Sequence, residues 1–460
     1  MIERIKTGIE ALDDKILGGG IPIYSVNIIG GCPGAGKTIL CQQILFNNAA
    51  PDTRSLYFTT VSEPTAKLIR YQQGFSYFDE EKVTEGHIIY VDIGSLIHKK
   101  GLSAGIEAII DSIEKFKGRI VAIDSFKAIN ELAESPSSFR QFAYTLCVEM
   151  IAWRCTSFLV GEYTRSALEN EPIFAIADGI IHLDSNLEGR KNRRVLSIAK
   201  MRGVDYFEGL HSISISQSGI SVFPRVKTPP ALSFSLSSEK LATGVSGLDQ
   251  MMEGGVPAGS STLIAGGTGT GKTTLSLHFL MEGAKREEPG LLVSFQEPPD
   301  QLKMIAKCFS WDIEKEIAEK KLFIFYTSPV ELDLDQHAFL VKEKIEEMGI
   351  KRVVVDSLMD IELAAFSDVH FRDHIYSLVN FFKSQGVTSV LTNELTEVFG
   401  GARFSDYGIS FIVDNLILLG YKKEESSIKR EITLLKMRGS GHKRGVNEFE
   451  ITNEGVVIQF

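Results

Sequence analysis

Two glycine-rich segments contain the residues best suited to phosphate chemistry. Residues 31–38 and 266–273 each fit the pattern G-x-x-x-x-G-K-[ST]. In such a loop the glycines let backbone N–H groups surround phosphate oxygens, the lysine reaches the β- and γ-phosphates, and the final hydroxyl ligates Mg²⁺. We therefore predict two nucleotide sites, formed by Gly31, Gly34, Gly36, Lys37, Thr38, Gly266, Gly269, Gly271, Lys272 and Thr273.

The flanking sequence predicts the elements that must position these loops. A short apolar run precedes each loop, at residues 25–29 and 261–265, and a stretch with helical periodicity follows each, at residues 38–45 and 273–280. The order strand, loop, helix places bound phosphates at a helix N-terminus. A chance glycine-rich turn would not recur twice in this context.

Further landmarks occur twice, in the same order, so the whole chain is an internal duplication. We predict two homologous α/β domains, 1–232 and 233–460, joined by a proline- and serine-rich linker. The paired landmarks are residues 7–13 with 243–249, 63–64 with 297–298, 124–125 with 356–357, 178–181 with 414–417, and 200–203 with 436–439.

Composition narrows the class of protein. Hydrophobic residues make up 43% of the chain and charged residues 23%, and no apolar run approaches the roughly 18 residues of a membrane span. The five cysteines show no C-x-x-C spacing, which favours reduced thiols and a cytoplasmic location. The net charge of −10 disfavours a nucleic-acid backbone as the main partner. The one dense basic cluster, 190–194, is interpreted as a solvated hairpin turn, with nucleic-acid or partner contact as the alternative.

Acidic residues follow strand-like runs in both halves. Asp124 and Asp356 each end a buried apolar run, where a parallel strand would deliver a carboxylate to Mg²⁺, as Walker B aspartates do. Glu63 and Glu297 follow the strand after each P-loop helix, a place suited to a base that orients the attacking water. A proline follows each glutamate, so a structural role as a charge at a helix N-terminus is the alternative.

Two pairs of cations form further candidate catalytic groups. Lys200 with Arg202, and Lys436 with Arg438, lie at the ends of runs with strand character. Cations two residues apart on a strand share a face, which suits binding of a γ-phosphate. Because both pairs are far along the chain from the P-loops, they could serve the nucleotide of a neighbouring subunit. The sequence alone does not distinguish that arrangement from one within the same subunit.

The combination of T-G-x-x-x-L-D, G-G-[IV]-P, P-loop, strand-end Glu-Pro, Asp-Ser and K-M-R-G resembles the KaiC family, circadian-clock ATPases and autokinases of the RecA superfamily, over essentially the whole chain. The resemblance implies an α/β fold of two tandem RecA-like P-loop NTPase domains, each a mostly parallel sheet flanked by helices. It also implies a double-ring homohexamer with ATP and Mg²⁺ at subunit interfaces, which the K-M-R-G cations reach across the interface. Ser440 and His442 resemble the family's residues near the ribose and base.

The chain also departs from the family pattern. The family has two adjacent glutamates at the strand end, whereas each half here has one, Glu63 or Glu297. The family is phosphorylated on an adjacent Ser and Thr in the second domain, where this chain has Ser410 followed by Phe411. Ser410 is therefore the candidate phosphoacceptor. The alternative is a small residue in a packed interface.

Three functions remain open on sequence alone. The first is a KaiC-like signalling protein that binds and hydrolyses ATP, with serine autokinase activity in the second domain as an added hypothesis and regulatory proteins as partners. The second is a RecA/RadA-like DNA-dependent ATPase, which would need basic and aromatic DNA loops; the stretches 134–140 and 364–373 are poor in Lys and Arg. The third is a non-catalytic scaffold gated by nucleotide.

Overall fold

The structure is a computed structural model that describes residues 3–60, 64–167, 171, 173–188, 191–226, 238–365, 367–395, 411–424 and 427–460, with residues 188 and 191 described by their backbone only. It divides into two compact units, Met1–Arg225 and Val226–Phe460. The predicted domain boundary, between residues 232 and 233, falls in 227–237, outside the described residues. Within the described part of the chain, no helix has the length and apolar character needed to cross a membrane.

The first unit is built on a nine-stranded sheet of order β11-β10-β9-β8-β3-β7-β6-β4-β5. Strands β8, β3, β7, β6, β4 and β5 pair in parallel, and β8 to β11 pair antiparallel at one edge. Its strands are β1 Arg4–Ile5, β2 Ile21–Pro22, β3 Val26–Gly31, β4 Arg54–Thr59, β5 Ile88–Asp92, β6 Gly118–Asp124, β7 Thr156–Gly161, β8 Gly179–Glu188, β9 Lys191–Met201, β10 His211–Ser216 and β11 Gly219–Phe223. Its helices are η1 Ala11–Ile16, α1 Lys37–Asn48, α2 Thr65–Gln72, α3 Glu80–Thr84, α4 Gly94–Lys100, α5 Leu102–Phe116, α6 Phe126–Glu131, α7 Pro136–Ala152 and α9 Ile173–Ile176.

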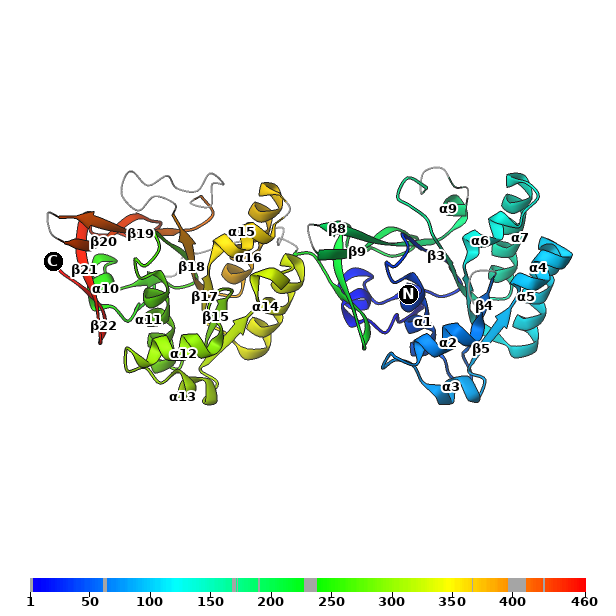
Figure 1. Ribbon diagram of the computed structural model, residues 1–460, viewed down its shortest axis with the longest axis horizontal. Helices are drawn as coiled ribbons and strands as arrows, with labels where there is room; N and C mark the ends of the chain where they lie inside the picture. Colours follow the sequence, from blue (N-terminus) through cyan, green and yellow to red (C-terminus); the bar gives the residue numbers. More distant parts are fainter. Residues whose placement is uncertain are drawn as a thin grey trace. The chain divides into compact units, whose positions relative to one another are not determined.

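Helices cover both faces of this sheet, as Figure 1 shows. Strands β3 and β7 are buried along their whole length, as expected for central parallel strands covered on both sides. One apolar core joins α1 to one face of the sheet, and a second joins α5 and α7 to the other. The predicted strand, loop and helix around residues 31–38 therefore sit in the middle of the layered unit.

The second unit repeats the architecture, with sheet order β16-β15-β17-β18-β14-β19-β20-β21-β22. Its strands are β12 Lys240–Leu241, β13 Val256–Pro257, β14 Ser261–Gly266, β15 Gly290–Ser294, β16 Leu322–Tyr326, β17 Arg352–Asp356, β18 Thr388–Glu394, β19 Asn415–Lys423, β20 Ile428–Met437, β21 Val446–Thr452 and β22 Gly455–Ile458. Its helices are α10 Ser246–Met251, α11 Lys272–Lys285, α12 Pro299–Lys307, α13 Ile313–Ala318, η2 Pro329–Glu331, α14 Leu334–Met348, α15 Leu358–Ala364 and α16 Asp368–Ser384.

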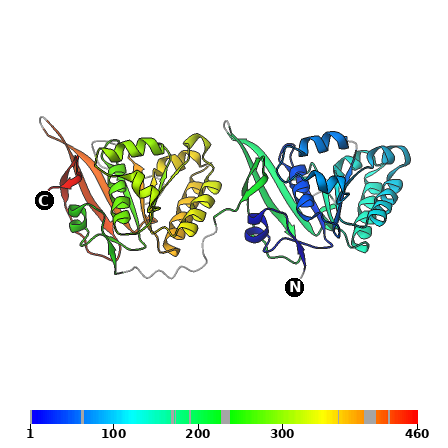
Figure 2. The same ribbon diagram turned by 90° about the horizontal axis from the view of Figure 1, so that it is seen from below.

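Two apolar cores again lie on opposite faces of the sheet, one under α10 to α12 and the other under α14 to α16. Figure 2 shows the same layering within each unit from below. The predicted fold class, a mostly parallel sheet flanked by helices in each half, is therefore confirmed. In both units the P-loop strand lies near the middle of the sheet, between two parallel neighbours.

Candidate nucleotide-binding sites

The first P-loop leaves the carboxyl end of β3 and leads directly into α1. Gly36, the residue before the helix, has φ of 103°, a left-handed conformation that glycine adopts without strain. The loop therefore directs the first backbone N–H groups of α1 toward an anion. Lys37 is buried, and its Nζ donates a hydrogen bond of 2.7 Å to the carbonyl oxygen of Cys32 within the loop. Burial lowers the pKa of Lys37, and the nearby carboxylates of Glu162 and Asp124 oppose that effect.

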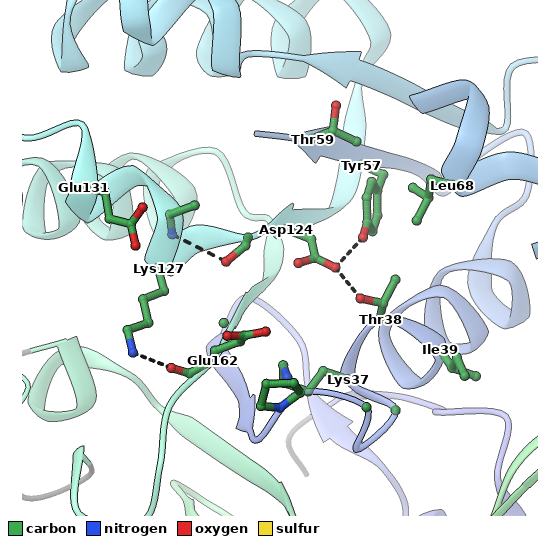
Figure 3. Close-up of a pocket in the computed structure, with 16 residues that line it drawn as sticks. Lys37, Thr38, Ile39, Tyr57, Thr59, Leu68, Asp124, Lys127, Glu131 and Glu162 are labelled. Atoms are coloured by element: carbon green, nitrogen blue, oxygen red, sulfur yellow. Dashed lines mark hydrogen bonds between the residues drawn. The ribbon is translucent and has the colours of Figure 1, made fainter. Parts of the chain in front are cut away.

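The candidate metal ligands of the first unit are in contact. Thr38 Oγ1 donates to Asp124 Oδ2 over 2.7 Å, although the two residues come from α1 and the end of β6. The hydroxyl of Tyr57, on β4, donates to the same carboxylate oxygen over 2.7 Å. One hydroxyl and one carboxylate fit Mg²⁺, which prefers oxygen ligands and is usually held by one or two carboxylates together with phosphate oxygens. Figure 3 shows these three side chains meeting.

A cavity of about 680 Å³ adjoins these residues. The P-loop, β4, β6, α6 and the end of β7 supply its walls, and Figure 3 shows the lining side chains around it. Its charged lining residues are Lys37, Asp124, Lys127, Glu131 and Glu162. This volume lies within the usual range for small-molecule sites, so the cavity beside the P-loop can accommodate a nucleotide.

The second P-loop has the same local geometry. Lys272 Nζ donates to the carbonyl oxygens of Gly266 and Gly267, each over 2.9 Å. Thr273 Oγ1 donates to Asp356 Oδ2 over 2.7 Å, which matches the hydroxyl and carboxylate pair of the first unit. Burial lowers the pKa of Lys272, while Glu394, Asp356 and Glu297 oppose that effect.

The two aspartates are held by hydroxyls from different strands. Tyr57 binds Asp124 from β4, whereas Thr392 binds the other oxygen of Asp356 from β18. The register places Leu292 on β15 where β4 has Tyr57, and Val160 on β7 where β18 has Thr392. The equivalent carboxylates, Asp124 and Asp356, are therefore held from opposite sides in the two units.

Glu297 lies among acidic groups near the second P-loop. Burial raises the pKa of its carboxyl, the charges of Asp356 and Asp360 raise it further, and Lys272 opposes them. The neighbouring Gln296 donates its Nε2 to both carboxylate oxygens of Asp360, over 3.1 and 3.2 Å. A raised pKa beside a P-loop lysine is compatible with a proton-accepting role. Glu63 lies outside the described residues.

Sequence reasoning missed a second acidic pair, Glu162 and Glu394. Glu162 directly follows β7 and Glu394 ends β18, so each stands beside the P-loop strand of its unit. Glu394 accepts a hydrogen bond from the hydroxyl of Thr268 in the P-loop. The signal was present in the sequence, because these glutamates are separated by the same interval as Asp124 and Asp356.

The K-M-R-G cations lie at the other end of the sheet from the P-loop of their own unit. Lys200 pairs with Ile180 near the start of β8, and β8 begins opposite Asn27 at the start of β3, whereas the P-loop leaves the end of that strand. Lys200 is therefore level with Ile28, three residues before Gly31, which is about 10 Å along the strand at the rise of an extended chain. Lys200 Nζ donates to the carbonyl oxygens of residues 174 and 175, over 3.2 and 3.3 Å, and Arg202 forms an ion pair of 3.2 Å with Asp178.

The second unit places its pair in the same way. Lys436 Nζ donates to the carbonyl oxygen of Val413 over 2.6 Å, and Arg438 lies 3.8 Å from the carboxylate of Asp414. Ser440 and His442 follow in the same loop, whose described neighbours are Met251 and Glu253 near the end of α10. These sequence-predicted residues therefore gather together but away from their own P-loop. Ser410 lies outside the described residues.

A different arginine reaches each P-loop from within its own unit. Arg194 Nε donates to the carbonyl oxygen of Gly34, and Arg430 Nε donates to that of Gly269, both over 3.4 Å. Arg194 belongs to the basic cluster interpreted from sequence as a solvated turn. The predicted hairpin is present between β8 and β9, and the half-buried Arg194 contacts the P-loop, a contact that the sequence did not indicate.

The folds and contacts define a protein with two P-loop nucleotide-binding domains of the α/β class. The family model described as "ATPase: KaiC" matches residues 5–227 and 241–460. The chain therefore belongs to the KaiC family, with two tandem RecA-like ATPase domains, which confirms the resemblance seen in the sequence. Membership of this ATPase family implies NTPase activity and suggests ATP as the bound nucleotide.

Curated relatives match the whole chain. The circadian clock oscillator protein KaiC of Rippkaea orientalis is 30% identical over 470 residues, which cover 100% of this chain and 89% of that protein. The circadian clock oscillator protein KaiC 1 of a Synechocystis species is 29% identical over the same length and with the same coverage. KaiC of Thermostichus vulcanus is 30% identical, again over 470 residues, with 100% and 89% covered. The similarity thus extends through both ATPase domains.

Proposed function

We propose that this protein is a cytoplasmic, ATP-hydrolysing signalling protein that assembles as a double-ring homohexamer, with ATP at the interfaces between copies. The observation that carries the proposal is the position of Lys200, Arg202, Lys436 and Arg438 at the sheet end away from their own P-loops. Cations in that position are directed away from the nucleotide of their own P-loop, so we infer that they complete a nucleotide site on another copy. Regulatory proteins would then read the nucleotide or phosphorylation state.

In each unit the chain's own groups have separate tasks. The P-loop N–H groups and Lys37 or Lys272 bind the phosphates, and Thr38 with Asp124, or Thr273 with Asp356, would hold Mg²⁺. When bound, Mg²⁺ neutralises charge on the phosphate oxygens. Glu63 and Glu297 would accept the proton of the attacking water, and the raised pKa of Glu297 is compatible with this role. Ser440 and His442 would contact the ribose and base across the interface.

Mixing two inactive variants tests the shared site. Lys37→Ala/Lys272→Ala lacks functional P-loops, and Arg202→Ala/Arg438→Ala lacks the arginines for the neighbour. We expect each variant alone to hydrolyse ATP poorly and a 1:1 mixture to recover about a quarter of wild-type turnover. This value follows because random assembly places an intact P-loop beside an intact arginine pair at about one interface in four. Phosphate release measures the recovery.

Lys99→Ala, a change of an exposed lysine on α4, serves as the control for loss of a positive charge. The mixture must be assembled in ATP and its oligomeric state measured by light scattering. Mixed rings with no recovered turnover would contradict sites shared between copies. An Arg202→Ala/Arg438→Ala variant with full activity would contradict the same proposal.

We further propose that Ser410 accepts a phosphoryl group from ATP bound at a second-domain site. Incubation with γ-labelled ATP and Mg²⁺, with protein-bound label and free phosphate followed together, is expected to label wild type and not Ser410→Ala. Ser405→Ala is the matched control, because it removes a nearby serine hydroxyl and should keep the label.

Glu297→Gln should lower phosphate release from the second site by about 10²- to 10⁴-fold, the usual contribution of a general base.

The labelling experiment separates the ATPase from the autokinase. Phosphate release without label on the protein would leave an ATPase and refute the autokinase proposal. Label that persists in Ser410→Ala would place the acceptor elsewhere. Tight ATP binding without phosphate release would instead favour the nucleotide-gated scaffold.

A further inference from the structure

A lysine of the first unit stands beside the candidate metal ligands and has no counterpart in the second unit. Lys127 is the second residue of α6, which begins directly after Asp124 and Ser125. Met359 holds the same position in α15, after Asp356 and Ser357. The two units, otherwise alike in P-loop geometry, therefore differ by one positive charge at this place.

Lys127 lines the same cavity as Lys37, Thr38 and Asp124. Its Nζ donates a hydrogen bond of 2.6 Å to the carbonyl oxygen of Glu162, and its ammonium lies 5.5 Å from the centre of the Tyr163 ring. Figure 3 shows the side chain extending along the cavity wall toward Glu162. A lysine ammonium has three N–H donors, so the bond to one carbonyl leaves capacity to bind phosphate oxygens in this cavity.

Lys127 lies at the end of the cavity where the terminal phosphate of a nucleotide would bind. Mg²⁺ bridges β- and γ-phosphate oxygens in P-loop enzymes, so Thr38 and Asp124 mark the β/γ end of the site. Lys127 lies three residues after Asp124 in the chain. Its ammonium contacts the carbonyl oxygen of Glu162, directly after β7, the strand between β3 and β6. The ammonium is thus held beside the gap between the P-loop and Asp124.

Charged side chains of both signs line the cavity. Three carboxylates, those of Asp124, Glu131 and Glu162, line the cavity with Lys37 and Lys127. The two ammonium groups are the lining groups that could donate charge-assisted hydrogen bonds to phosphate oxygens.

We propose that Lys127 binds the terminal phosphate of a nucleoside triphosphate and makes the first site discriminate more strongly than the second between triphosphate and diphosphate. This inference rests on the proposed function, because it assumes that the first P-loop binds nucleotide. It adds a specificity residue that acts within its own unit, apart from the cations supplied by a neighbouring copy.

Calorimetric titration with Mg²⁺ and either ADP or the non-hydrolysable analogue AMP-PNP tests the inference. The parent is Lys272→Ala, which leaves the first P-loop intact. Lys127→Met in this parent copies the side chain of the second unit. We expect affinity for AMP-PNP to fall about tenfold and affinity for ADP to change less than about twofold, since a charge-assisted hydrogen bond to the γ-phosphate is lost.

Two matched variants complete the experiment. Lys127→Arg keeps the charge and should keep most of the preference for AMP-PNP. Met359→Lys, in a Lys37→Ala parent, should increase the preference for AMP-PNP at the second site. Equal changes for the two nucleotides, or no change in either, would overturn the inference while leaving the nucleotide site intact. A Lys272→Ala parent that binds neither nucleotide would overturn the proposed function as well.

Discussion

Alanine in place of Lys37 or Lys272 is expected to remove nucleotide binding and turnover at one site while the other site persists. Each ammonium lies within its P-loop, bonded to loop carbonyls and close to the strand-end aspartate. Without this ammonium, the P-loop has no cation of its own to bind the β- and γ-phosphates. We expect turnover at the altered site to fall by at least about 100-fold, the scale for removing one group that stabilises transition-state charge.

The stoichiometry of bound nucleotide is the measurement. Wild type should retain about two nucleotides per chain and each variant about one, with both lost in the double variant, since each P-loop supports one site. Lys99→Ala, on the exposed surface of α4, should retain both. Unchanged stoichiometry in either single variant would contradict the assignment of two separate sites.

Substitution of Arg352 by methionine should destabilise the second unit by about 3 kcal/mol, the lower end of the cost of breaking a buried ion pair from one side, because the partner Glu288 is only partly buried. The Arg352 side chain is fully buried at the start of β17. It forms an ion pair of 2.6 Å with Glu288 and donates to the carbonyl oxygens of Ala242 and Phe279, each over 2.8 Å. Methionine would leave the carboxylate and both carbonyl oxygens without that partner.

Urea unfolding followed by tryptophan fluorescence measures the effect. The chain has two tryptophans. Trp153 packs against a core of the first unit, and Trp311 packs against a core of the second unit. Trp153→Phe therefore leaves a reporter of the second unit alone. A double variant, Arg352→Met/Glu288→Leu, should recover much of the lost stability, because it removes the unpaired carboxylate. Equal destabilisation of the single and double variants would contradict this account.

The parts of the sites that sequence predicted are those carried by short motifs and by the duplication. The P-loops and the aspartates at the ends of buried strands follow from local patterns, and the parallel sheet then brings Thr38 to Asp124 and Thr273 to Asp356. Apolar runs of strand length and helical periodicity also predicted the layers, since central parallel strands must be buried on both faces.

Contacts that depend on register across the sheet were not predictable. Tyr57 and Thr392 reach their aspartates from different strands, so comparison of the two halves gives no repeated signal for either. In the sequence Arg194 is one of several charges in a basic turn, and only the pairing of β9 in the sheet places it beside Gly34. Lys127 was missed for a related reason. It belongs to no motif and to no landmark shared by the two halves, because Met359 holds its position in the second half.

Strand β9 has a further consequence. It carries Arg194 beside the P-loop of its own unit and Lys200 near its other end, about 20 Å apart at the rise of an extended strand. With Lys200 at a neighbouring copy's nucleotide, as proposed, one stiff segment touches two successive ATP molecules. If hydrolysis of one ATP displaces β9, the strand would carry that displacement to the nucleotide site of the next copy. The nucleotide state at one interface would then influence the position of the cations at the next.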